Sequence, residues 1–212
     1  MFELGIMKKD EIKINGLYKI EEKDLKRCAS VAAHAFLDDN SSKFLLSSKL
    51  TLKTLCEYYR VIFNATYKKM HMYAESKNLN GFIIVAPIEN TELTTWDFIK
   101  AGGLKLLLRC GIGTLCRSFA YEQNCIRIRK KIISTNSWYV FQFGVNPKKQ
   151  GTGLGSKLMK SVLELLDDKK VSCYLETHKM INVKMYEHFG FLVKSIDKLP
   201  NKTMQQFAML RN

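Results

Sequence analysis

A glycine-rich run in the last third of the chain holds the residues that point most directly to chemistry. Gly151, Gly153 and Gly155 follow a β-rich stretch, Trp138 to Val145, and precede a helical pattern. Glycine has no Cβ, so the backbone N–H groups of such a turn can point together at an anion, and the following helix adds its positive dipole end. This geometry predicts a site that holds a pyrophosphate mainly by backbone groups.

Two better-known glycine loops do not fit this run. A dinucleotide fingerprint requires G-x-G-x-x-G, whereas these glycines alternate, and the 57 residues after Gly155 are too few for the remaining strands of that fold. A P-loop requires Gly-Lys followed by Ser or Thr, whereas Gly155-Ser156-Lys157 has the order inverted. Both nucleotide-binding classes are therefore excluded.

The run resembles the signature of the GNAT N-acetyltransferases, Gln/Arg-x-x-Gly-x-Gly/Ala after a strand, which Gln150, Gly153 and Gly155 match. The resemblance continues in the family's order with an Asn-Pro after the strand, with Leu175-Glu176-Thr177, and with Asn182 to Phe191. The nearest likeness is to the puromycin N-acetyltransferase-like branch, which shares the LET segment and an N-x-x-x-Y-x-x-x-G-F end. Puromycin itself is not implied as the acceptor.

The resemblance covers residues 138–212 well and residues 16–88 through the order of elements. It implies an α/β (α+β) fold with a mixed β-sheet, flanked by helices and splayed between the strand ending at Val145 and the strand Val171 to Thr177. The pantetheine arm of coenzyme A (CoA) would lie in that gap. The implied reaction is transfer of an acetyl group from acetyl-CoA to a primary amine of an unidentified small molecule or peptide, by direct attack.

Residue roles follow from the same resemblance. The backbone N–H of Val145 would bind the thioester carbonyl as an oxyanion-type donor. Tyr186 would protonate the departing thiolate, since a phenol with a pKa of about 10 stays protonated at neutral pH; an aromatic that packs its helix on the sheet is the alternative. The cofactor-binding residues expected are Phe143, Val145, Gln150, Gly151, Gly153, Leu154, Gly155, Ser156, Tyr186 and Asn182, which lies one helical turn before Tyr186.

The general base is left open by the sequence. No acid stands in the strand Trp138 to Val145, where some family members place a Glu. Glu176, at the end of its strand, is taken as the catalytic candidate, with His178 and Glu75 as further candidates; a water relay would need no dedicated residue. A buried carboxylate that satisfies a backbone group or a basic neighbour is the alternative for Glu176.

The charge balance predicts an anionic ligand. The formal net charge is +14, and eight basic residues face one acid between Lys100 and Lys131. CoA fits this excess, with Lys148 and Lys149 placed for its 3′-phosphate or merely solvated. The alternatives are a non-catalytic acyl-CoA-binding module and, ranked last, a basic nucleic-acid-binding protein, since the aromatics follow core-like alternation. We therefore expect no nucleic-acid partner.

Periodicity predicts one domain over residues 1–212. A strand at 16–20, helices at 21–37 and 51–70, and a hairpin turning at Asn80-Gly81 come first. An insertion of two or three helices follows at about 91–137, and the ending reads β-α-β-α-β-β. Leucines of the insertion would line an acceptor pocket, rest on lipid or pack in a core, the last being the commoner fate: Leu104, Leu106, Leu107, Leu108 and Leu115.

The remaining features bear on location. The N-terminus lacks the apolar core of a signal peptide, and the apolar stretch Ile99 to Phe119 is interrupted by four basic residues and four glycines, so no transmembrane segment is expected. Six cysteines form no CxxC pair, and no metal site is predicted. A cytoplasmic protein with reduced thiols is the expectation, and the oligomeric state is not predicted.

Overall fold

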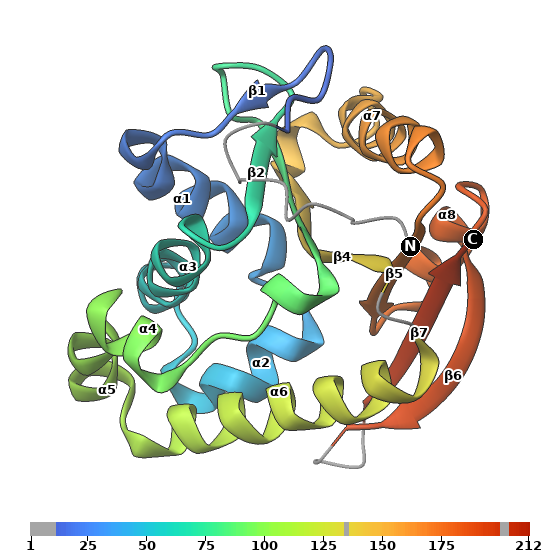
Figure 1. The fold of residues 1–212 in the computed structure, drawn as a ribbon. Helices are drawn as coiled ribbons and strands as arrows, with labels where there is room; N and C mark the ends of the chain where they lie inside the picture. The colour runs from blue at the N-terminus through green and yellow to red at the C-terminus, as the bar shows by residue number, and fades with distance from the viewer. Residues whose placement is uncertain (1–11, 134–135, 200–203) are drawn as a thin grey trace.

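The computed structural model describes residues 12–133, 136–199 and 204–212. Within them the chain forms one seven-stranded sheet of order β1-β2-β3-β4-β5-β7-β6 (Figure 1). All neighbouring pairs are antiparallel except β4 and β5, which are parallel. The strands are β1 (Tyr18–Lys19), β2 (His71–Ala74), β3 (Gly81–Pro87), β4 (Ser137–Val145), β5 (Ser172–Thr177), β6 (Leu192–Lys198) and β7 (Gln205–Arg211).

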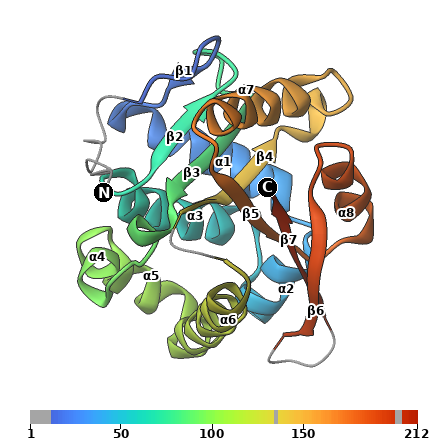
Figure 2. The same ribbon diagram turned by 45° about the vertical axis from the view of Figure 1, so that its right-hand side comes forward.

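Helices cover both faces of the sheet (Figures 1 and 2). One face packs against α1, α3 and α6, with α5 on the outer side of α3, and the other face packs against α7 and α8. The central strands β2, β3, β4 and β5 are therefore buried on both faces, which explains their near-continuous apolar runs, whereas the edge strand β6 has no buried residue. The helices are α1 (Leu25–Phe36), α2 (Asn40–Leu46), α3 (Leu52–Tyr67), α4 (Thr95–Lys100), α5 (Gly103–Cys110), α6 (Ile112–Ile132), α7 (Leu154–Asp168) and α8 (Met180–Glu187).

The sheet splays between β4 and β5, as expected. Ser137, Trp138 and Tyr139 pair with the first three residues of β5, and the two strands then diverge. A bulge assists this, because Ile84 of β3 lies opposite Gln142 while Val85 lies opposite Val140, so that Phe141 is an extra residue in β4. The second half of β4 thus has β3 on one side and the gap on the other.

The β2–β3 hairpin is confirmed, but the predicted turn at Asn80-Gly81 is wrong. The positive φ of this loop is at Leu79, at 53°, and Gly81 is already in β3. The carboxylate of Glu75 closes the loop by accepting the N–H groups of Asn80 and Gly81, each at 2.8 Å. Gly81 is needed for close packing, because a Cβ there would lie 2.9 Å from Cδ1 of Leu158 in α7.

The N-terminal half contains one helix more than the periodicity predicted. The two expected helices are α1 and α3, and Thr51 caps α3 by accepting the N–H of Thr54 at 3.1 Å. Between them lies α2, where Asp39 accepts the N–H of Ser41 at 3.0 Å. Because α2 has only seven residues, its helical period cannot be recognised in the sequence, although its cap residue Asp39 is of a type that favours a helix start.

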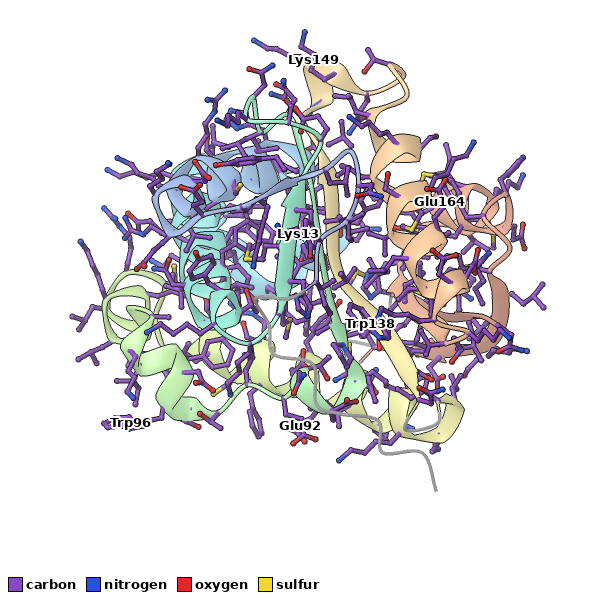
Figure 3. All side chains as sticks on the ribbon, turned by 45° about the horizontal axis from the view of Figure 1, so that its top comes forward. Lys13, Glu92, Trp96, Trp138, Lys149 and Glu164 are labelled. Carbon is purple, nitrogen blue, oxygen red and sulfur yellow. The ribbon has the colours of Figure 1, made fainter. Side chains whose placement is uncertain are left out.

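The segment before β4 contains the three helices α4, α5 and α6. Arg109 of α5 pairs with Glu57 of α3, and Nε of Arg117 in α6 donates to the carbonyl of Leu45 in α2 at 2.9 Å. Trp96 of α4 lies at an outer edge of the molecule (Figure 3). Within the described ranges, no helix is long and apolar enough to cross a membrane.

Candidate active site

The glycine loop lies between β4 and α7. Asn146 begins the 3₁₀ turn η5 (Pro147–Lys149) by accepting the N–H of Lys148 at 3.1 Å. Gly151 and Gly153 follow with φ values of 77° and 83°, a left-handed conformation that favours glycine. A Cβ on either glycine would meet no atom within 4 Å, so this side of the loop is open.

The start of α7 presents backbone donors beside this loop. Gly153 is the N-cap, and Leu154, Gly155 and Ser156 form the first turn. The N–H groups of a first turn have no intrahelical acceptors and carry the positive end of the helix dipole. The loop and the helix start therefore form a place where an anion can be bound by backbone groups.

Val145 and Gln150 are joined at the end of β4. The side chain of Gln150 donates from Nε2 to the carbonyl oxygen of Val145 at 3.2 Å, and the backbone N–H of Gln150 donates to the carbonyl oxygen of Pro147 at 3.4 Å. The side chain thus fixes the loop against the strand. The backbone N–H of Gln150 is the one predicted phosphate donor that already has an acceptor within the loop.

Three predicted cofactor residues meet on the α7–α8 face of the sheet. The Phe143 ring lies against Gly155, where a Cβ would be 3.2 Å from its Cζ, and 6.5 Å from the Tyr186 ring, between centroids. Tyr186 also contacts Phe191 edge-on at 5.9 Å. The structure therefore places the helix start, β4 and Tyr186 around one position beside the gap.

Tyr186 is buried, and burial raises the pKa of its phenol well above the ordinary value. The hydroxyl therefore stays protonated at neutral pH and can donate a hydrogen bond or a proton. Asn182 donates from Nδ2 to Oγ1 of Thr177 at 3.2 Å, which holds α8 to the end of β5. The carbonyl oxygen of the Asn182 side chain is not used in this contact and can accept a hydrogen bond.

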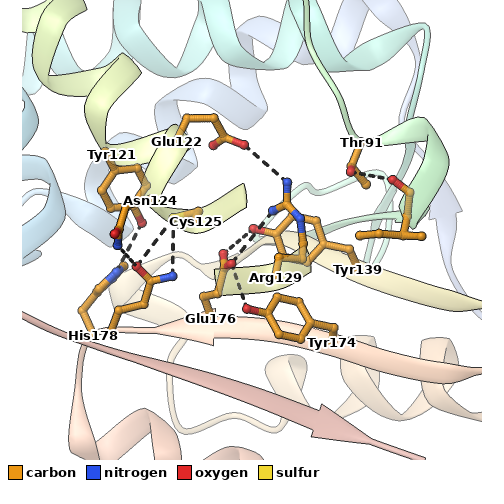
Figure 4. Close-up of polar contacts among 12 residues, drawn as sticks. Thr91, Tyr121, Glu122, Asn124, Cys125, Arg129, Tyr139, Tyr174, Glu176 and His178 are labelled. Atoms are coloured by element: carbon orange, nitrogen blue, oxygen red, sulfur yellow. Dashed lines mark hydrogen bonds and ion pairs between the residues drawn. The ribbon is translucent and has the colours of Figure 1, made fainter. Parts of the chain in front are cut away.

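Glu176 faces the opposite side of the sheet, under α6 (Figure 4). Its Oε2 accepts the hydroxyl of Tyr139 at 2.7 Å and its Oε1 that of Tyr174 at 3.0 Å. Arg129 of α6 lies 3.9 Å from Oε1 and over the Tyr139 ring, 4.5 Å from its centroid. Residues alternate across a strand, so Glu176 and Tyr174 face α6 while Leu175 faces α8.

Burial sets the protonation of this cluster. The Glu176 side chain is 5% exposed. Burial raises its pKa to about 7 against the opposing effect of Arg129 and the two tyrosine hydroxyls. Burial also raises the pKa values of Tyr139 and Tyr174, which therefore remain hydrogen-bond donors. Such a carboxyl group exchanges its proton near neutral pH, which suits a general base.

The other two candidate bases lie in different settings. His178 is next to the same helix, with Nε2 3.3 Å from the hydroxyl of Tyr121, and burial lowers its pKa. Glu75 is in the β2–β3 loop, where both carboxylate oxygens hold backbone N–H groups. Glu176 and His178 thus lie on the α6 face of the sheet, whereas Glu75 stabilises the β2–β3 loop.

Arg129, Tyr139 and Tyr174 were missed by the sequence reasoning. A signal for Arg129 was present, because Cys125, Ile128 and Ile132 share its helix face, so an arginine occupied a position of apolar periodicity. One of its guanidinium nitrogens, Nη1, is buried and has no hydrogen-bond partner among the described residues. Its second nitrogen, Nη2, lies 3.5 Å from Glu122.

A basic hollow adjoins the glycine loop. It has a volume of about 260 Å³ and lies between α1 and η5, with Arg27, His34 and Lys148 among its lining residues. Lys149 is exposed beside it. No group of His, Cys, Asp and Glu within the described ranges could hold a metal ion.

Comparisons with known proteins agree with this geometry. A model of the Acetyltransferase (GNAT) family matches residues 109–191, which span α6, β4, the glycine loop and α8. An uncharacterised N-acetyltransferase of Schizosaccharomyces pombe is 24% identical over 181 residues, covering 82% of this chain and 73% of that protein.

Solved structures share the fold. A histone acetyltransferase HPA2-related acetyltransferase from Corynebacterium glutamicum has a TM-score of 0.65 at 13% identity, covering 92% of this chain and 94% of that one. The PaiA N-acetyltransferase of Thermoplasma acidophilum, solved in complex with coenzyme A, has a TM-score of 0.51 at 13% identity, covering 92% and 97%. They confirm the predicted fold class, and the puromycin N-acetyltransferase-like branch stays a prediction.

Proposed function

We propose that the chain is an acetyltransferase of the GNAT type that transfers the acetyl group of acetyl-CoA to a primary amine by direct attack. The observation that carries this proposal is the divergence of β4 from β5, with an open glycine loop at its end and a buried tyrosine beside it. The comparisons favour neither a non-catalytic acyl-CoA module nor a nucleic-acid-binding protein.

The residues around the gap suit a CoA molecule. Gly151 and Gly153 leave open space at the loop, and the first turn of α7 offers the N–H groups of Leu154, Gly155 and Ser156 to a pyrophosphate. The hollow lined by Arg27 and Lys148 supports a place for the 3′-phosphate. The free edge of β4 beyond Tyr139 can hydrogen-bond pantetheine, with Val145 near the loop.

The acid and the base of the proposed reaction lie on opposite faces of the sheet. Tyr186 is on the α7–α8 face and Glu176 is on the α6 face. A thioester in the gap would therefore be reached by the tyrosine from one side and by the amine from the other. Bond formation from the amine nitrogen to the acetyl carbon accompanies cleavage of the carbon–sulfur bond, while Glu176 accepts a proton from the amine and Tyr186 donates one to sulfur.

The acceptor is proposed only as a primary amine, of a small molecule or a peptide. The helices α1, α2 and α6 cover the face on which it would approach. All six cysteines are free, which supports a reducing compartment, and we place the protein in the cytoplasm.

Calorimetric titration with acetyl-CoA tests the cofactor site, with Ser156→Asp and Ser156→Asn as the matched pair. Ser156 is exposed at the third position of α7, so both side chains fit and differ only in charge. Two like charges about 8 Å apart repel by ~2 kcal/mol at an effective dielectric constant of about 20, which corresponds to about thirtyfold in affinity before salt screening. We expect Ser156→Asp to weaken binding at least tenfold and Ser156→Asn to change it little.

The same pair separates binding from folding. An acid in the first turn of a helix stabilises it by about 0.5 kcal/mol, so Ser156→Asp should unfold at the same temperature as wild type or higher. Loss of affinity without loss of stability would assign the loop to the anion. Equal affinity of Ser156→Asp and wild type would show that the pyrophosphate is not bound at α7.

Thiol release with a panel of amines then tests turnover. Aminonucleosides, polyamines and peptides present primary amines in different settings. Acceptor-dependent release of CoA is expected for one class. Binding of acetyl-CoA without release for any amine would contradict the proposed reaction.

A further inference from the structure

The helices α4, α5 and α6 expose an unusual amount of apolar surface. Half of the large apolar side chains that are exposed in the described chain lie in this one segment. Leu108 is 83% exposed and Trp96 62%. We call this set the α4–α6 patch: Trp96, Ile99, Leu104, Leu108, Ile112 and Phe119.

The patch has a regular helical arrangement. In α5, Leu106 and Cys110 are buried, while Leu104 and Leu108, one turn apart, point away from the core. In α6, the exposed residues Ile112, Cys116 and Phe119 recur at the same spacing. Each helix thus has one apolar face inside and a second one outside, which core packing does not explain.

Basic residues lie within the patch. From Trp96 to Phe119 there are four basic residues and one acid, a net charge of +3. Lys100 and Lys105 are exposed, and Lys100 lies over the Trp96 ring at 5.9 Å. The acid is Asp97, which pairs with Lys69 at 2.6 Å. The exposed charge beside the apolar side chains is therefore positive.

The patch projects outward and lies far from the glycine loop. Five of the six side chains of the patch are more than half exposed, so they stand out from the surface instead of lining a groove. Lys149 lies at the top of the molecule and Trp96 at its lower left, well apart (Figure 3). An object bound at the patch would leave the proposed CoA site accessible.

We propose that the α4–α6 patch docks on the surface of a bilayer that contains anionic lipids. Projecting Trp, Leu, Ile and Phe side chains flanked by lysines are the features that place a helix in the interface of such a membrane. The interface of a protein partner would be depleted of lysine at its core, which disfavours that occupant. The proposal is independent of the acetyl-transfer reaction.

Tryptophan fluorescence with lipid vesicles provides the test. The chain has two tryptophans, and Trp138 is buried, so a change in emission reports Trp96. Phosphatidylcholine vesicles with phosphatidylserine should shift the emission to shorter wavelength, and Trp96→Phe should abolish the shift. Vesicles of phosphatidylcholine alone should bind the protein at least tenfold more weakly.

Paired variants then assign the contact. Leu104→Gln with Leu108→Gln should weaken vesicle binding at least tenfold in sedimentation. Leu192→Gln with Ile196→Gln removes two residues of β6 that are similarly exposed, at 61% and 58%, and should leave binding unchanged. Lys100→Gln and Lys105→Gln should each weaken binding to anionic vesicles about fivefold, the effect of one lysine near such a surface.

Three outcomes would overturn the proposal. One is the absence of vesicle binding by the folded wild-type protein. Another is an equal loss of binding in the β6 pair. The third is a wild-type dimer, seen by light scattering without lipid, that the Leu104→Gln, Leu108→Gln pair dissociates, because the patch would then join two copies of the chain.

Discussion

Replacing Glu176 with glutamine should change how the stability of this protein depends on pH. Glu176 is buried among Tyr139, Tyr174 and Arg129, and burial raises its pKa from 4.5 to about 7. Between these values the folded protein keeps a proton that the unfolded chain has lost. Stability is therefore lost as the pH rises from about 4.5 through about 7.

The magnitude follows from the difference between the two pKa values. They differ by about 2.5, and each pKa unit corresponds to about 1.4 kcal/mol, so the free energy of unfolding should fall by about 3 kcal/mol over this range. Glutamine does not titrate, so this contribution should vanish in Glu176→Gln. Rearranged hydrogen bonds would shift the free energy of unfolding of the variant by the same amount at every pH. The slope of that free energy against pH, in contrast, reports the proton on Glu176.

Urea unfolding at a series of pH values from 4.5 to 8 measures this slope. The wild-type curve should fall relative to that of Glu176→Gln by about 3 kcal/mol. Glu164→Gln, a change in an exposed residue of α7, serves as the control and should follow wild type. Parallel curves for wild type and Glu176→Gln would refute the reasoning about burial.

The same variant tests the base separately. If Glu176 accepts the amine proton, kcat/KM should rise with pH through about 7 in wild type and lose this limb in Glu176→Gln, with a fall of at least a hundredfold. Full activity in the variant would assign Glu176 a purely structural role. The predicted effect on stability would then still stand.

Three further predictions concern other residues. Tyr186→Phe should lower kcat about a hundredfold in steady-state assays and leave the KM for acetyl-CoA nearly unchanged, because it removes only the proton donor; an unchanged kcat would contradict that role. Glu75→Gln should lower the free energy of unfolding by about 2 kcal/mol in urea, because one oxygen cannot serve both the Asn80 and the Gly81 N–H. Lost activity in that folded variant would instead point to catalysis. Gly81→Ala should lower the free energy of unfolding by about 1–3 kcal/mol in the same assay, because its Cβ would lie 2.9 Å from Leu158; an unchanged value would contradict this packing.

The elements from β4 onward were predictable because each has one clear sequence pattern. The apolar, β-rich run of β4 and the helical period of α7 extend over nine and fifteen residues. The position of the β2–β3 turn was not predictable. Asn80-Gly81 is a strong local signal for a turn, but hydrogen bonds to Glu75, which lies outside that dipeptide, determine the loop conformation. Its buried carboxylate fixes both N–H groups, and the positive φ moves to Leu79.

Some residues of the candidate site could also be placed from the sequence, and others could not. Phe143 and Gly155 lie together because β4, the glycine loop and α7 are consecutive, and Tyr186 joins them because α8 packs on the same face of the sheet. Arg129 could not be placed, because its contact with Glu176 depends on how a 21-residue helix crosses the sheet. Tertiary packing sets that crossing, and no local pattern reports it.

The contact between Arg129 and Glu176 also constrains how this sequence can change over evolutionary time. Loss of Arg129 alone would leave a buried acid without its cation, and loss of Glu176 alone would leave the buried Arg129 paired only with Glu122, whose side chain is much more exposed. Substitutions at these two positions, which are 47 residues apart, are therefore expected to be tolerated only when both change together. A homologue that lacks α6 would also have to replace Glu176, so we expect α6 and the Glu176 position of β5 to be retained or lost together.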